Sequence, residues 1–327
     1  MKRLKYICMT TARMLSLVAG VCILSFILVS LSPIDPLTAY IGPESTLSQE
    51  AQQQIAEYWG LNDPPVQRFM TWAGNTLHGD LGISITYNQP VATVIFERFK
   101  YSLGLILAAW VLSGITGFAA GIVSALNRGR PADKIIKTFC LVIQSAPVFW
   151  FGLLMLTVFS VMLGWFPMGQ AVPVYKLAEE VTLWDRVYHM ILPAVTLSIL
   201  GTGKITLYTR QKFIEIMESN YIVFARARGE TTGQIVMRHG IRNIAIPAIT
   251  VQFASFSELF GGIALAETVF SYPGLGSAIT AAALNADAPL LIGIAMFSAV
   301  FVFAGNFIAN ILYSIVDPRL KEGGYHA

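Results

Sequence analysis

Long apolar stretches alternate along this chain with shorter segments that are rich in polar residues, proline and glycine. Each apolar stretch has about eighteen or more residues, which is enough for a helix to cross the hydrocarbon core of a bilayer. Pro147 lies inside the third stretch and predicts a kink there, because proline removes one backbone hydrogen bond. The pattern predicts six membrane-spanning helices, at residues 14–31, 102–126, 135–163, 190–208, 244–266 and 289–315.

Two of the segments between these stretches are distinctive. Residues 32–101 contain six prolines and polar helical material, which predicts a folded insert outside the membrane. Residues 267–289 separate the last two apolar stretches and turn at Pro273-Gly274. We expect this second segment either to be re-entrant or to lie along the membrane surface.

Composition agrees with a membrane protein. The chain is 55% hydrophobic and only 13% charged, whereas an ordinary soluble domain is about 25% charged. Much of the surface must therefore face lipid. The net charge of +3 is too small to indicate a nucleic-acid partner.

The positive charges are distributed unevenly between the loops. Of the 22 Lys and Arg residues, 17 lie in residues 1–13, 125–138, 204–243 and 317–327. This bias predicts that both termini are cytoplasmic. The expected organisation is an N-terminal tail with the first helix (1–31), a periplasmic insert (32–101), a five-helix core (102–315) that includes a cytoplasmic loop (209–243), and a cytoplasmic tail (316–327).

Motifs for catalysis or for nucleotide and metal binding are absent from the sequence. The chain has no H-E-x-x-H motif, no P-loop, and no Ser/Lys or paired-Asp arrangement within the apolar stretches. The four histidines are widely separated. We therefore expect a chain that is not an enzyme and that binds no metal or cofactor itself. A transporter subunit, a channel and a scaffold remain as classes.

The cytoplasmic loop is a basic segment between two apolar stretches. Residues 220–247, which include most of this loop, carry Arg226, Arg228, Arg238 and Arg242 but a single acid, Glu230. Residues 221–229 are predicted to form about two turns of helix, which the glycine at the end would terminate. Such a helix could dock a separate protein, or it could lie on anionic lipid headgroups.

Glu258 is the most informative polar residue inside an apolar stretch. A carboxylate at a helix centre costs about 2.5–3.5 kcal/mol on insertion scales, so it should face a pathway or another subunit. Ser255, Gly261 and Gly262 share its helical face, which is therefore small and polar. Glu258 could attract a cationic group of a substrate, or it could form a hydrogen bond to a neighbouring subunit.

Three further charged residues lie towards the ends of apolar stretches. Glu267, at the outer end of the fifth stretch, could act in a gate or in a structural contact at the helix end. Lys204 and Arg210 lie at the inner end of the fourth stretch. Long basic side chains in such positions commonly reach lipid headgroups.

Several motifs occur in order over some 300 residues. One is Ala225-Arg226-Ala227-Arg228-Gly229 with Tyr221 before it and His239, Arg242, Asn243 and Pro247 after it. The others are Gly60-Leu61 with Pro64-Pro65, Gly79-Asp80-Leu81-Gly82, residues 145–150, 164–167, 189–193 and 267–276, and Asp317-Pro318-Arg319. In these motifs and their order the chain resembles the peptide/nickel branch of the binding-protein-dependent ABC importer permeases, and the first motif resembles the coupling loop of that family.

The resemblance implies an all-α type I ABC importer transmembrane domain in a bacterial inner membrane. It also implies a second homologous permease, two ABC ATPase subunits that hold ATP and Mg, and a periplasmic solute-binding protein. The loop that contains Tyr221 and Gly229 would insert into a groove of one ATPase, while Glu258, Ser255 and Glu267 are candidates for the substrate pathway. The implied cargo is a di- or oligopeptide, with nickel or a metal–metallophore complex as the alternative and a non-ABC channel or scaffold as a more distant one.

The chain departs from the family pattern in two places. It has Val223-Phe224-Ala225 where more general permeases show Glu-Ala-Ala. Its last loop reads Ala286-Asp287-Ala288-Pro289 where the family often has Arg-Asp-Tyr-Pro. We interpret Asp287 as the N-cap of the sixth predicted helix.

Overall fold

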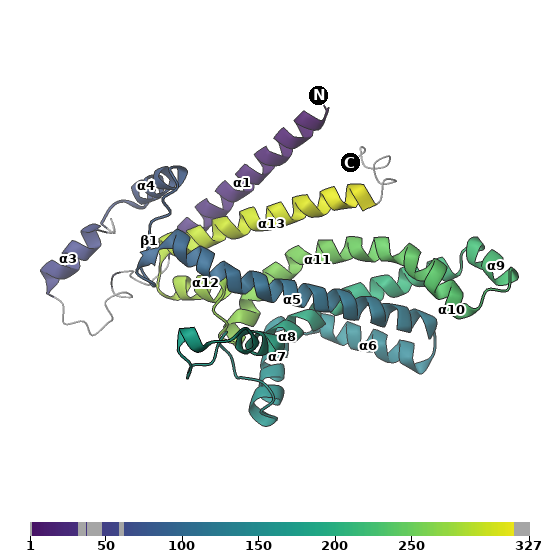
Figure 1. Ribbon diagram of the computed structural model, residues 1–327. Coiled ribbons are helices and arrows are strands. Elements are labelled where there is room, and N and C mark those ends of the chain that lie inside the picture. Colours follow the sequence, from purple (N-terminus) through teal and green to yellow (C-terminus); the bar gives the residue numbers. More distant parts are fainter. Residues whose placement is uncertain (1, 32–36, 38–47, 59–61, 317–327) are drawn as a thin grey trace. The chain divides into compact units, whose positions relative to one another are not determined.

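The computed structural model describes residues 2–31, 37, 48–58 and 62–316, and these residues are mainly α-helical (Figure 1). They form two compact units, residues 1–102 with 273–304 and residues 103–272 with 305–327. The division falls within α5 (Val91–Leu126) and within α13 (Ala288–Val316). Two motifs of the sequence analysis, Gly60-Leu61 and Asp317-Pro318-Arg319, lie outside the described residues.

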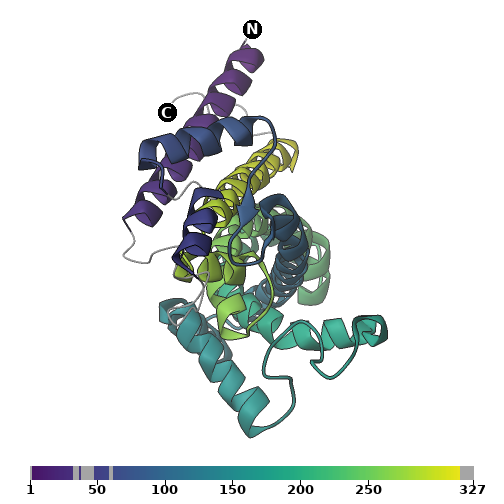
Figure 2. The ribbon, with the colours of Figure 1, turned by 90° about the vertical axis from the view of Figure 1, so that its left-hand side faces the viewer.

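The first unit joins the N-terminal part of the chain to the segment around residue 280. Its core contains the start of α5 and of α13 together with Leu275, Ala278 and Ala282. Phe26 and Phe69 bring α1 and α4 together, with ring centroids 5.1 Å apart, and Figure 2 shows α4 crossing α1. Besides α5 and α13, its elements are α1 (Lys2–Ser30), α3 (Gln49–Tyr58), α4 (Pro65–Leu77), the antiparallel strands β1 (Ile83–Ser84) and β2 (Gln89–Pro90), and α12 (Leu275–Leu284).

Asp287 caps α13, as the sequence predicts. Its Oδ1 accepts a hydrogen bond from the Leu290 backbone N–H at 3.1 Å. Its Oδ2 accepts bonds from the Ser84 hydroxyl at 2.6 Å and from the Thr86 backbone N–H at 2.9 Å. One buried carboxylate thus both starts a helix and holds the hairpin of β1 and β2 against it.

The segment after the Pro273-Gly274 turn is a helix with one face packed inside the first unit. It forms α12, and four of the ten residues of this helix are buried in the core of the first unit. The small side chains of α12, among them Ala278 and Ala282, allow this close packing.

The second unit is a bundle built on two long helices, α8 and α11, which pack against each other. Close approach of α5 and α8 requires glycine, because an added Cβ at Gly121 would lie 2.6 Å from the Thr209 Cβ. Besides parts of α5 and α13, the elements are α6 (Pro131–Ser145), α7 (Val148–Met155), the π-helix η1 (Leu156–Met162), the 3-10 turn η2 (Ala178–Glu180), α8 (Leu183–Met217), α9 (Asn220–Ala227), α10 (Thr232–Ile235), the π-helix η3 (Val236–Gly240) and α11 (Ile241–Val269).

Among the described residues, four helices are long and apolar enough to cross a membrane: Val91–Leu126, Leu183–Met217, Thr232–Val269 and Ala288–Phe307. A fifth candidate is the pair Pro131–Ser145 and Val148–Met162, if the pair is one span. A shorter apolar helix, Ala12–Leu28, covers most of the first predicted span.

The third predicted span is not a single kinked helix. Its two parts meet at a bend of 111°. Ala146 has an extended backbone and Pro147 lies directly before α7, so the chain leaves one helix and begins another. The residue before a proline avoids the helical region, which explains the complete break.

The helices also extend beyond the apolar stretches. α5 begins at Val91, inside the segment predicted as an insert, and α8 continues to Met217. Hydrophobicity locates the part of a helix that suits lipid, whereas polar residues can continue the same helix into water.

Candidate functional site: an exposed helix and a charged cavity

The basic loop contains the short helix that its sequence predicts. α9 covers Asn220–Ala227, and Gly229 follows with a φ of 85°, which favours glycine at a helix end. One face of α9 is internal, because Ile222 and Ala225 are buried against Ile235.

The opposite face of α9 carries apolar side chains that no described part of the chain covers. Tyr221, Val223 and Phe224 are exposed, Phe224 to 72%. Ala227, Arg226 and Arg228 are exposed beside them. In Figure 1, α9 lies at one end of the bundle. An exposed apolar patch within a basic surface is typical of a protein contact.

The remaining residues of the predicted coupling loop divide into two groups. His239 is half-buried, with its Nε2 3.0 Å from a carboxylate oxygen of Glu230, so it ties η3 to the end of α9. The Asn243 side chain donates to the His239 backbone carbonyl at 2.7 Å. Arg242 is exposed. His239 and Asn243 therefore stabilise the loop, whereas Arg242 is available to a partner.

A buried ion pair lies near the same end of α8. Arg210 donates through Nε and Nη2 to the two carboxylate oxygens of Asp133, at 2.6 and 2.8 Å. Asp133 also accepts from the Ser124 hydroxyl at 2.6 Å and from the Gly129 backbone N–H at 2.9 Å. The pair thus connects α8 to the turn between α5 and α6. Arg210 is 15% exposed, so the expectation that it reaches headgroups is wrong.

A second charged pair lines a cavity between α8 and α11. Lys204 Nζ lies 2.5 Å from Glu258 Oε1. Their side chains are 51% and 61% exposed. The cavity has a volume of about 170 Å³, and its lining residues are Val148, Leu197, Leu200, Gly201, Lys204, Ser255, Glu258, Leu259 and Gly262.

The structure brings together only part of the predicted pathway set. Ser255 lines the cavity with Glu258, although its hydroxyl donates to the Gln252 carbonyl at 2.8 Å. Glu267 is fully buried and is not among the cavity-lining residues. It lies nine residues after Glu258, which puts the two carboxylates on about opposite faces of α11.

Lys204 is the cavity residue whose pairing the sequence analysis missed. Its position near the end of an apolar stretch predicts contact with headgroups, whereas the structure pairs its Nζ with Glu258. Helical spacing relates residues within one helix, so it does not pair α8 with α11. The available signal was the presence of opposite charges inside two apolar stretches.

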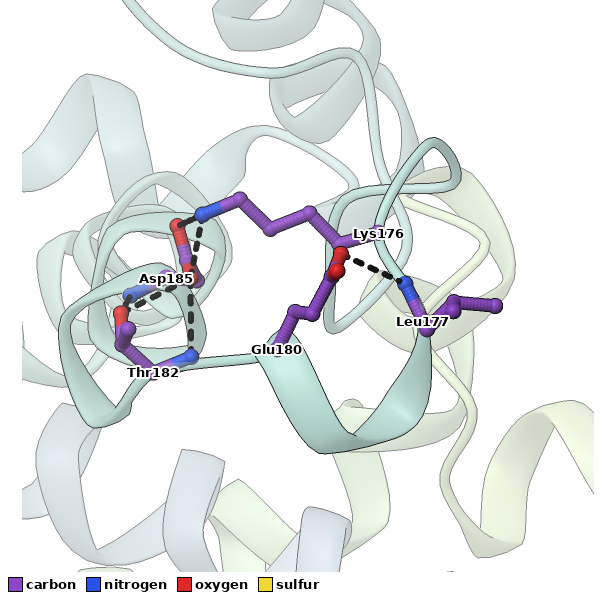
Figure 3. A network of polar contacts seen from close by, with 5 residues as sticks. All are labelled: Lys176, Leu177, Glu180, Thr182 and Asp185. Carbon is purple, nitrogen blue, oxygen red and sulfur yellow. Dashed lines mark hydrogen bonds and ion pairs between the residues drawn. The ribbon is translucent and has the colours of Figure 1, made fainter.

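A separate polar network fixes the segment that leads into α8 (Figure 3). Lys176 donates to both carboxylate oxygens of Asp185, at 2.8 and 2.9 Å, and this bond raises the pKa of Lys176. The Thr182 hydroxyl accepts from the Asp185 backbone N–H at 3.2 Å, while Thr182 donates back to the Asp185 carboxylate. These reciprocal hydrogen bonds form a capping box, which fixes the N-terminus of α8 directly after the loop.

Comparisons with known proteins agree with this architecture. Residues 117–322 match the family described as the binding-protein-dependent transport system inner membrane component. The chain belongs to this family. It is therefore a permease component of an ABC importer and a multi-pass protein of the inner membrane.

Similar curated proteins match along almost their whole length. The oligopeptide transport system permease protein AppB of Bacillus subtilis is 36% identical over 97% of this chain and 99% of its own. The di/tripeptide permease protein DppB of Pseudomonas aeruginosa is 32% identical, over 93% and 94%. The glutathione permease protein GsiC of Escherichia coli is 32% identical, over 92% and 94%.

A solved structure supports the fold of this permease. It is the MetNI methionine ABC transporter in inward-facing conformations, with a TM-score of 0.57 and 14% identity over 69% of this chain and 97% of that one. The expected all-α ABC importer transmembrane fold is confirmed. As a permease of this family, the chain works with ATPase and binding-protein partners.

Proposed function

We propose that this permease forms half of the translocation pathway of an ATP-driven importer for di- or oligopeptides. The observation that carries this proposal is the 36% identity to an oligopeptide permease along 97% of the chain. A permease named for di- and tripeptides and one named for glutathione, itself a small peptide, match along similar lengths. The common chemistry of these cargoes is a short peptide.

The other half of the pathway would come from a second, homologous permease, with two ATPase subunits below the pair and a solute-binding protein on the periplasmic side. The half-exposed charges of Lys204 and Glu258 support a covering subunit, because charged side chains at this depth do not face lipid. The chain itself would be non-catalytic and would hold no cofactor, with ATP and Mg bound by the ATPases.

The coupling contact would be the exposed face of α9. Tyr221, Val223 and Phe224 would enter a groove of one ATPase, and Arg226 and Arg228 would contact acidic groups around it. Ile222 and Ala225 would hold α9 against the rest of the bundle. Movement of the ATPase would then reach α8 and α11 through packed side chains.

Uptake by a strain deleted for this gene tests the cargo. We expect the deletion to abolish accumulation of labelled dialanine or trialanine and to leave uptake of labelled nickel unchanged, and we expect the cloned gene to restore peptide uptake. Loss of nickel uptake with normal peptide uptake would favour the metal alternative. Normal uptake of both would overturn the proposed function.

A further inference from the structure

The Lys204–Glu258 pair is poorly suited to contact with lipid. Lys204 and Glu258 lie four and eight residues inside the nearer ends of the apolar stretches 190–208 and 244–266. Their side chains nevertheless stay 51% and 61% exposed in the single chain. Ionisable groups at such depth face a bundle interior or a water-filled cavity. In the membrane, water or another subunit must therefore cover this face.

The cavity beside the pair has room for part of a small molecule. Its volume of about 170 Å³ compares with about 30 Å³ for one water molecule in the liquid. An added Cβ at Gly262 would meet no atom within 4 Å. Packing within this chain therefore does not require glycine there, and its absent side chain leaves space next to Glu258.

We propose that Lys204 and Glu258 bind the charged termini of the transported peptide, Lys204 the carboxylate and Glu258 the ammonium group. This inference rests on the proposed function, since a peptide importer would deliver such a molecule to the cavity. When such a peptide binds, its carboxylate replaces the Glu258 carboxylate as the partner of Lys204. Its ammonium group replaces the Lys204 ammonium as the partner of Glu258. Each of the two side chains thus keeps one partner of opposite charge.

The geometry permits this exchange. The termini of a dipeptide are about 7 Å apart, because an extended chain spans about 3.3–3.6 Å per residue. Lys204 and Glu258 can separate by this amount, since both side chains are long and half-exposed. A half-exposed ion pair is weak, and a transport site must bind its cargo weakly enough to release it. A longer peptide would engage one charged terminus at a time.

The competing explanation is that the pair only packs against the second permease. Small and polar residues on one helical face, here Ser255 and Gly262, are typical of helix–helix contacts in membranes. The two explanations differ in chemistry. A substrate site distinguishes a free amine from a free carboxylate, whereas a subunit contact responds equally to every peptide.

A protection assay on the complete purified transporter separates them. Gly262→Cys, in a chain whose three native cysteines are replaced, places a thiol in the cavity for a water-soluble thiol reagent. Dialanine, N-acetyl-dialanine and dialanine amide are added directly, without the binding protein, and the concentration that halves the labelling rate is measured. The same measurement is repeated with Glu258→Gln or Lys204→Met.

We expect Glu258→Gln to raise the half-protecting concentration of dialanine and its amide at least about tenfold, the effect of losing one hydrogen bond to a charged group. The same variant should lower that of N-acetyl-dialanine, because Lys204 no longer has Glu258 as a competing partner. Lys204→Met should weaken protection by dialanine and N-acetyl-dialanine and spare the amide.

Equal effects on all three peptides, or no protection by any of them, would overturn the inference. Peptide uptake by the unmodified chain tests the proposed function separately. Normal dialanine uptake together with no protection would therefore reject the terminus-binding site alone.

Discussion

Two ion pairs of α8 have opposite environments although their basic residues, Lys204 and Arg210, are six positions apart. Arg210 is buried with Asp133, whose carboxylate accepts four hydrogen bonds, including those from Ser124 and Gly129. Lys204 and Glu258 make one contact at the edge of a cavity and stay half-exposed. The C-terminal part of α8 is thus anchored, while Lys204 nearer its middle presents a half-exposed charge.

The difference follows from desolvation. A buried pair needs several hydrogen bonds to offset the loss of water, and removing one partner leaves a buried charge. A half-exposed pair keeps part of its hydration, so it contributes little and can be broken at small cost. The buried pair would thus suit the proposed coupling through α9, and the half-exposed pair would suit the proposed binding site.

The largest expected effect comes from breaking the buried pair. Asp133→Leu should destabilise the permease by about 3–5 kcal/mol, because Arg210 keeps its charge without a partner. The double variant Asp133→Leu/Arg210→Met should recover much of this loss. Thermal unfolding in detergent and the amount of chain in the membrane measure both. Equal stability of the single variant and the unmodified chain would contradict the anchoring role.

A substitution on the exposed face of α9 tests whether this helix couples the permease to the ATPase. Phe224→Asp should abolish ATP-driven transport and leave the amount of membrane-inserted permease unchanged, because Phe224 is 72% exposed and supports no core. Ala225→Trp is the matched variant on the buried face, and it should displace α9 from Ile235. Co-purification of the ATPase subunits measures docking. Retention of transport by Phe224→Asp would remove this face from the coupling contact.

The smallest change in stability is expected at the half-exposed pair. Glu258→Gln and Lys204→Met should each change the free energy of unfolding by no more than about 1 kcal/mol. The same thermal unfolding measurement applies. A loss as large as that of Asp133→Leu would show that both pairs are structural anchors, and the comparison between them would fail.

The sequence predicted those features that depend on residues close together in the chain. The helix at α9, its glycine stop at Gly229 and the N-cap at Asp287 all follow from local rules of turn and cap chemistry. Ser255 and Glu258 share a face because residues three positions apart on a helix are neighbours. Family motifs identified the fold.

Features that depend on packing between distant segments could not be predicted in this way. The partners of Lys204 and Arg210 lie 54 and 77 positions away on other helices. Pro147 predicted a kink in the third apolar stretch, but the sequence carries no information on the size of the bend, which is 111°. The burial of α12 likewise depends on α5 and α13, which complete its core.

ATP-dependent accumulation of labelled dialanine in proteoliposomes tests the central claim most directly. The vesicles contain this permease, its homologous partner, the two ATPase subunits and the external binding protein. The account predicts that the peptide accumulates above its external concentration only with ATP and that omission of this chain abolishes accumulation. Equilibration of the peptide without ATP, as through a channel, would contradict the account.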